Sequence, residues 1–135
     1  MKKTICLLTS IIMIFCFVSC KKAEETGDIW NNATYTENTA FGSGKTQIEL
    51  EVKAGDKSVT FTIKTDKTTL ADALDGAGLI PAGTGEYIKT LNGMTADYDI
   101  DKSYWSLSKN GEYLMTGATD TNIANGEHYE FTHTK

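Results

Sequence analysis

Residues 101–117, DKSYWSLSKNGEYLMTG, decide the fold of this chain. The pair Asn110-Gly111 divides the stretch into two runs that are rich in aromatic and apolar residues. Asn and Gly tolerate the positive φ angles of a tight turn, so an Asn-Gly pair between two such runs indicates a β-hairpin. We therefore expect this hairpin to supply a central pair of strands and part of the core.

Two more strands are predicted upstream, where apolar and polar residues alternate. Residues 47–53 alternate in this way, and residues 58–65 repeat the pattern after a turn at 54–57. Period-two alternation is typical of an antiparallel pair with one buried face and one solvent-exposed face. The predicted core residues of the two strands are Ile48, Leu50, Val52, Val59, Phe61 and Ile63.

The hydrophobic period changes after Thr69, which predicts one short helix. Apolar residues at 70, 73, 74 and 77 follow the i, i+3, i+4, i+7 spacing of an amphipathic helix. Thr69 is suited to cap its first turn, and Asp72 lies near the positive end of the helix dipole. A helix of about two to three turns is unstable alone, so it must dock on a sheet.

Two further strands complete the prediction, at residues 86–91 and 128–134. The order hairpin, helix, strand, hairpin, strand indicates the α+β class, with one short helix packed across a mixed sheet. A β-grasp-like topology is the simplest arrangement that fits this order. The alternative is a small β-sandwich in which the helix is incidental.

Residues 1–19 have the pattern of a secretory signal peptide. Lys2 and Lys3 precede an apolar run at 5–18, which is too short to be read as a membrane span. The ending Ser19-Cys20 resembles the lipobox of bacterial lipoproteins, in which the Cys is lipidated and becomes the first residue. We expect an exported protein anchored on the outside of the cell membrane through Cys20. An ordinary signal peptide or an uncleaved anchor is the alternative.

Composition limits the classes of partner. The chain has no Arg, and removal of residues 1–19 would leave eleven Lys against eighteen acidic residues. An acidic, Arg-free domain is poorly suited to bind nucleic acid, because Arg is the preferred bidentate partner of phosphate and guanine. The only cysteines are Cys6, Cys16 and Cys20, so residues 21–135 contain no disulfide and no thiolate metal site.

The chain is expected to divide at two points, after residue 19 and after residue 44. Residues 20–44 are mostly polar and close on Gly42-Ser43-Gly44, which indicates a flexible tether. Its four large apolar residues leave room for an extra edge strand as the alternative; they are Ile29, Trp30, Tyr35 and Phe41. Residues 45–135 form the predicted folded domain.

Residues 46–135 resemble a known family, most specifically at Tyr104-Trp105-x-Leu107 and at Asn125-Gly126-Glu127. The run TADYDIDKSYWSLSKNGEYLMTG after Gly93, and DTNIANGEHYEF after it, resemble the bacterial secreted domains called DUF4430. They are also similar to the C-terminal domain of the transcobalamin and intrinsic-factor cobalamin carriers. The resemblance implies a β-grasp-like, non-catalytic domain that binds a small molecule, with a corrinoid as the first candidate. In the carriers, a separate helical domain makes most contacts with the ligand.

The same resemblance implies a ligand-binding strand at Trp105, Ser106 and Leu107, although Ser106 stands where the carriers have Gln. From the residues alone, Tyr104 and Trp105 must point to opposite faces of the strand. One of them is then expected in the core and the other on the surface. Which of the two is exposed stays open at this point, and both can be packing residues.

A second candidate site is a metal site at Asp97, Asp99 and Asp101. Alternate carboxylates can converge on a hard cation, and calcium loops begin with this spacing. The EF-hand pattern fails, because Lys102 stands where Gly is required and Ser108 where a bidentate Glu is required. A solvated acidic loop without Ca²⁺ is the alternative.

No motif predicts an enzyme. The sequence lacks a G-x-S-x-G elbow and an H-E-x-x-H zinc motif. His128 and His133 are an odd number of residues apart, so one strand would turn them to opposite faces, which argues against a transition-metal site. Three hypotheses remain: a surface-anchored ligand-binding module, a calcium-binding module, and an adhesion domain that binds protein through a sheet edge.

Overall fold

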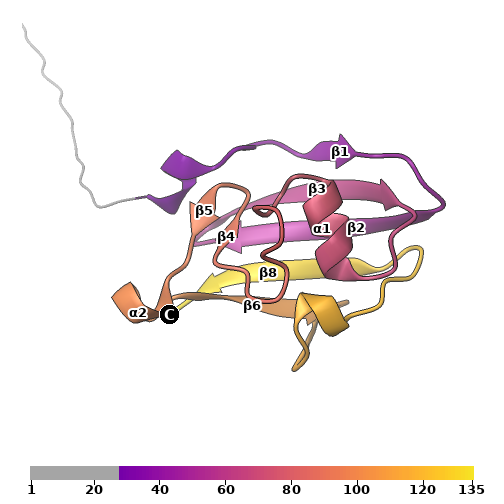
Figure 1. Ribbon diagram of the computed structural model, residues 1–135. Helices are drawn as coiled ribbons and strands as arrows, with labels where there is room; N and C mark the ends of the chain where they lie inside the picture. The colour runs from indigo at the N-terminus through magenta and orange to yellow at the C-terminus, as the bar shows by residue number, and fades with distance from the viewer. Residues whose placement is uncertain (1–27) are drawn as a thin grey trace, which may run out of the picture.

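The computed structural model describes residues 28–135, which form one mixed sheet with a short helix packed on it (Figure 1). The predicted α+β class and β-grasp-like arrangement are confirmed. The predicted signal peptide, Cys20 and the first part of the predicted tether lie outside the described residues. The strands are β1 Thr39–Phe41, β2 Thr46–Ala54, β3 Lys57–Thr65, β4 Thr90–Leu91, β5 Met94–Thr95, β6 Tyr104–Lys109, β7 Glu112–Tyr113 and β8 His128–Thr134. The helices are α1 Leu70–Gly76 and α2 Tyr98–Asp101, with 3₁₀ turns η1 Ile29–Asn32 and η2 Ala118–Asp120.

The main sheet has the strand order β1-β3-β2-β8-β6-β7. The hairpins β2–β3 and β6–β7 are antiparallel, as their turn sequences predict. The expectation that β6–β7 forms a central pair is wrong, because β7 is a two-residue strand at the edge of the sheet. β8 lies between β2 and β6 and is parallel to β2 but antiparallel to β6. The two hairpins therefore meet only through β8.

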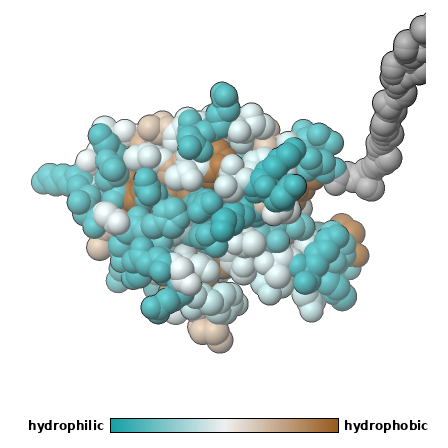
Figure 2. All heavy atoms as spheres, turned by 180° about the vertical axis from the view of Figure 1, so that it is seen from behind, coloured by the Kyte–Doolittle hydropathy of each residue, from teal (hydrophilic) through white to brown (hydrophobic). Residues whose placement is uncertain are grey.

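The two faces of the sheet differ in chemistry. Leu50 lies opposite Tyr129 on the face that carries α1, and both side chains are completely buried. One residue earlier, Glu49 lies opposite His128 on the other face. That outer face, seen from behind in Figure 2, is largely hydrophilic. The alternation seen in the sequence thus corresponds to one packed face and one open face.

Helix α1 covers the packed face, as the sequence predicts. The Thr69 hydroxyl accepts a hydrogen bond from the Asp72 N–H at 3.2 Å, which caps the first turn. The side chains on the helix face toward the sheet are buried; they are Leu70, Ala71, Ala73 and Leu74. With only seven residues, the helix depends on this packing. None of the helices among residues 28–135 has the length and apolar character needed to cross a membrane.

Residues 28–44 are packed against the sheet, which differs from the expected flexible tether. β1 pairs in parallel with the edge of β3. Trp30 is buried, and its Nε1 donates to the Ala54 carbonyl at 2.8 Å. Tyr35 and Phe41 pack edge-on at 5.1 Å. Burial of these apolar side chains opposes the entropy lost on ordering the segment.

The predicted strand at 86–91 is wrong over most of its length. Only Thr90–Leu91 is a strand, and it pairs with β5 in a separate two-stranded hairpin. The turn at Asn92-Gly93 is confirmed, with φ angles of 55° and 80°. Asn92 holds this hairpin in front of the main sheet, because its N–H donates to the Leu79 carbonyl at 2.7 Å (Figure 1).

Candidate functional site at the β6 edge

The unpaired edge of β6 is the first feature of the candidate site. β8 pairs with all six residues of β6 along one edge. Along the other edge, β7 pairs only with Ser108 and Lys109, and the Leu114 N–H donates to the Leu107 carbonyl at 2.8 Å. Within the described residues, no strand pairs with this second edge at residues 104–106.

Two hollows of about 240 and 280 Å³ lie along this edge. They share three lining residues, Ile88, Tyr104 and Trp105. Ser106 and Leu107 line the first hollow together with Trp105. All three residues of the predicted ligand-binding strand therefore border one hollow, although their role in binding stays a prediction.

Trp105 forms a wall of the hollow rather than an exposed platform. Its side chain is only 8% exposed, and its Nε1 donates to the Lys89 carbonyl at 3.0 Å. His133 meets the indole edge-on, with ring centroids 5.4 Å apart. Burial lowers the pKa of His133, so the imidazole beside Trp105 is neutral at neutral pH. Tyr104 is the exposed member of the pair, at 39%.

Ser106 and Leu107 are held by the sheet. The Ser106 hydroxyl donates to the Thr132 carbonyl at 3.3 Å, which directs it toward β8. Leu107 is almost fully buried and lies opposite Phe131. Ser106 and Leu107 therefore form the floor of the hollow. The aromatic side chains of Tyr104 and Tyr113, which also line it, are more exposed.

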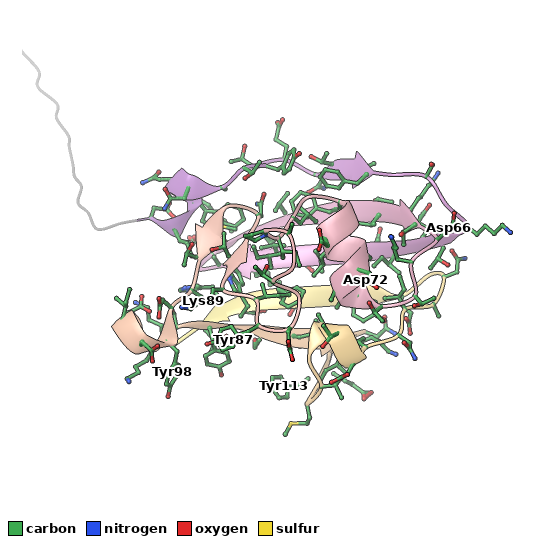
Figure 3. The ribbon with its side chains drawn as sticks, in the orientation of Figure 1. Asp66, Asp72, Tyr87, Lys89, Tyr98 and Tyr113 are labelled. Carbon is green, nitrogen blue, oxygen red and sulfur yellow. The ribbon has the colours of Figure 1, made fainter. Side chains whose placement is uncertain are left out.

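Three exposed side chains form the rim of the candidate site, and sequence reasoning did not assign them to it. Tyr87 is 62% exposed, Tyr113 60% and Met115 90%. Figure 3 shows Tyr87 and Tyr113 projecting away from the sheet beside β6. Tyr113 and Met115 line the first hollow and Tyr87 the second. Large exposed apolar side chains gathered around hollows are typical of a binding surface.

Among the described residues, Asp97, Asp99 and Asp101 do not form a group whose ligand atoms lie within 4.8 Å of one another. Asp97 accepts the Asp99 N–H at 3.0 Å and so caps α2, and its other oxygen lies 3.3 Å from Lys89 Nζ. The Ser103 hydroxyl and N–H hydrogen-bond to Asp101 and lower its pKa, the hydroxyl having the larger effect. Lys89 and Ser103 are the partners of the Asp97 and Asp101 carboxylates.

A larger hollow, of about 420 Å³, lies between α1 and the end of β3. Its rim is mostly charged or small, with Lys64, Asp66 and Lys67 beside a single aromatic residue, Phe41. The β6 edge has the higher density of aromatic side chains. It is therefore the better candidate for a ligand with a flat apolar surface.

Comparison with known proteins agrees with this fold. The family described as "Domain of unknown function (DUF4430)" matches residues 67–135, half of the chain. The chain belongs to the DUF4430 family. The matched residues of this DUF4430 protein include α1, the β4–β5 hairpin, β6 and β8, and so contain both hollows at the β6 edge.

The crystal structures that are similar to this DUF4430 protein include two binding proteins. One is a candidate metal-binding protein from Ruminococcus gnavus ATCC 29149, with 29% identity and a TM-score of 0.61; the match covers 67% of this chain and 98% of that one. The other is haptocorrin in complex with Cbi, with 22% identity and a TM-score of 0.55. That match covers 70% of this chain but only 26% of haptocorrin, so it shows the fold alone. No curated protein matches the chain.

Proposed function

We propose that this DUF4430 protein is a non-catalytic module that binds a small molecule at the β6 edge and is held at the cell surface by a lipid on Cys20. The observation that carries the binding proposal is the pair of hollows flanking Trp105, rimmed by exposed Tyr87 and Tyr113. Both similar structures are described as binding proteins or as holding a ligand, and neither is described as an enzyme.

A corrinoid is the first ligand to test. The rim offers flat aromatic surfaces and a polar strand edge, which suit a large planar molecule with amide side groups. The fold that this chain shares with haptocorrin supports the choice, because that structure holds Cbi. In this proposal the hollow supplies one side of the site, and a separate partner domain or protein covers the other.

Binding of a peptide by strand addition is less favoured at this edge. Only residues 104–106 of β6 lack a partner strand within the described part of the chain. Added strands need a longer run of free backbone groups, because a typical strand has roughly 5–6 residues.

The test is a titration of the purified chain with cobinamide, followed by the absorbance of the corrin. Tyr113→Ala should weaken binding at least about tenfold, which corresponds to about 1.4 kcal/mol. Tyr98→Ala is the matched control, because Tyr98 is an exposed tyrosine (48%) on α2 and lines neither hollow. No binding by the unmodified chain, or equal weakening in both variants, would reject the proposed corrinoid site.

A further inference from the structure

Four side chains that can bind or orient a metal ion occupy adjacent positions on the outer face of the sheet. The parallel register of β2 and β8 places Glu49 opposite His128 and Glu51 opposite Glu130. Residues two apart on a strand point to the same face, so all four side chains share the open face. This face lies on the far side of the sheet from α1 (Figure 2).

Three of these side chains bring their ligand atoms together. One such atom each from Glu51, His128 and Glu130 lies within 4.8 Å of the other two. The His128 Nε2 lies 3.3 Å from Glu51 Oε1. Two ligands of a tetrahedral zinc ion, each at about 2.0–2.2 Å from the metal, are about 3.3–3.6 Å apart. The spacing already present between imidazole and carboxylate is therefore that of a ligand pair.

Glu49 contacts the other nitrogen of the same imidazole. The His128 Nδ1 lies 3.3 Å from Glu49 Oε1. A histidine that binds a metal through one nitrogen usually donates the N–H of the other nitrogen to a carboxylate, which fixes its tautomer and ring orientation. In the tautomer that is protonated at Nδ1, the lone pair of Nε2 faces Glu51 and can bind a metal.

The negative charge around His128 also favours binding of a cation. Glu51 and Glu130 are direct cross-strand neighbours, and like charges in that position destabilise a sheet. Lys53 offsets one of them through its contact with Glu130 Oε2 at 3.0 Å. Glu49 adds a third carboxylate, so that Glu49 and Glu51 both contact the single imidazole of His128. The side chains of Glu51 and Glu130 are 21% and 27% exposed, so solvent screens this repulsion only in part.

We propose that Glu51, His128 and Glu130 bind one divalent transition-metal ion, with Zn²⁺ as the reference ion, and that Glu49 positions the His128 ring. Imidazole with carboxylates suits zinc, cobalt and nickel, whereas calcium and magnesium prefer oxygen ligands alone. His133 plays no part, because it lies beside Trp105 on the packed face. The ligands thus come from two neighbouring strands, which the spacing of the two histidines along one strand did not reveal.

The test uses the full chain, purified without a polyhistidine tag and alkylated so that its cysteines cannot bind metal. Calorimetric titration should give one Zn²⁺ site, with Ca²⁺ at least tenfold weaker. His128→Gln and Glu51→Gln should each lower the Zn²⁺ affinity at least tenfold. The matched controls are the variants His133→Gln and Asp99→Asn, which should keep the Zn²⁺ affinity of the unmodified chain.

Glu49 needs a separate measurement, because it acts through His128. The ring ¹⁵N chemical shifts of His128 in the zinc-loaded chain should show a protonated Nδ1 and a metal-bound Nε2. Glu49→Leu should perturb the Nδ1 signal and lower the affinity about 10- to 100-fold. An Nδ1 signal unchanged by Glu49→Leu would remove Glu49 from the proposal.

The same titrations can also overturn the proposed metal site. Equal Zn²⁺ affinity in His128→Gln, Glu51→Gln and the unmodified chain would overturn it, as would an equal loss in the two control variants. Calcium binding as tight as zinc binding would contradict the assigned metal class. If one variant does not fold by circular dichroism, the other still decides the result.

Discussion

The carboxamide of Asn92 makes two hydrogen bonds with the backbone of Tyr35. Its Oδ1 accepts the Tyr35 N–H at 2.9 Å, and its Nδ2 donates to the Tyr35 carbonyl at 2.9 Å. Asn92 is only 1% exposed and has a φ of 55°, so it serves the β4–β5 turn and the N-terminal segment together. This contact fastens a segment that lies 57 residues away in the sequence.

Asn92→Gly should loosen residues 28–44. Gly accepts the positive φ but loses both hydrogen bonds, and each buried group left without a partner costs about 1–3 kcal/mol. Urea unfolding measures the loss of stability, and limited proteolysis should show faster cleavage within residues 28–44. Asn110→Gly is the control, since Asn110 also has a positive φ, in an exposed turn. Equal protease protection in the unmodified chain and Asn92→Gly would contradict the contact.

Trp105→Ala should destabilise the domain by about 3–5 kcal/mol, because it empties a large buried site. Trp105→Phe keeps an aromatic ring and removes one of the two donors to the Lys89 carbonyl, which keeps the Ala96 N–H at 2.8 Å. The hydrogen bond lost should cost about 0.5–1.5 kcal/mol. Both values come from urea unfolding. Tyr104→Ala, on the neighbouring exposed residue, should change stability much less. If Trp105→Ala were no worse than Tyr104→Ala, Trp105 would not belong to the core.

Glu127 should make stability depend on acidic pH. Burial raises its pKa, but hydrogen bonds from Lys109, Tyr129 and the Ala124 N–H outweigh burial and lower the pKa below the ordinary 4.5. A carboxyl with a lowered folded-state pKa stabilises the protein above its unfolded-state pKa. That stability is lost as the pH falls through the folded value.

Glu127→Gln should therefore show a shallower loss of melting temperature between about pH 5 and pH 3 than the unmodified chain. Asp28 and Asp101 also have lowered pKa values and will keep part of the slope in the variant. Thermal melts across this range measure the difference. Glu112→Gln, at an exposed carboxyl on β7, is the control. The same slope in Glu127→Gln and the unmodified chain would show that Glu127 is not the titrating group.

Cys20→Ser tests the proposed lipid anchor. Loss of the thiol prevents acylation, so the variant should move from the membrane fraction to the soluble fraction of the host cell. Fractionation followed by immunoblotting measures the shift, and Cys16→Ser should leave the distribution unchanged. Membrane retention of Cys20→Ser would argue for an uncleaved apolar anchor instead.

Local patterns predicted the local elements of this fold. Alternation predicted β2 and β3, the Thr69 cap predicted α1, and Asn110-Gly111 predicted the β6–β7 turn. The ordered packing of residues 28–44 could not be predicted. It depends on the hydrogen bond from Trp30 to the Ala54 carbonyl and on the hydrogen bond from Asn92 to Tyr35. These partners are distant in sequence, and the polar composition of the segment gave the opposite indication.

For the candidate sites too, local features could be predicted from the sequence, whereas contacts between distant segments could not. Family resemblance pointed to Trp105, Ser106 and Leu107, which do border one hollow. Alternation could not tell whether Trp105 or Tyr104 is buried, because that depends on which face the β4–β5 hairpin covers. Glu49 and Glu51 share one face of β2, and His128 and Glu130 share one face of β8, but only the parallel pairing of β2 with β8 makes the two pairs neighbours.

The central place of β8 has a consequence for the order of folding. β8 follows all its neighbours in the sequence, yet it is the strand that joins the β2–β3 hairpin to β6. A growing chain that has not passed residue 134 therefore holds two separate half-sheets, each with an unfilled edge. Because such long-range pairing is slow to form, we expect both open edges to stay exposed to aggregation until β8 has been synthesised.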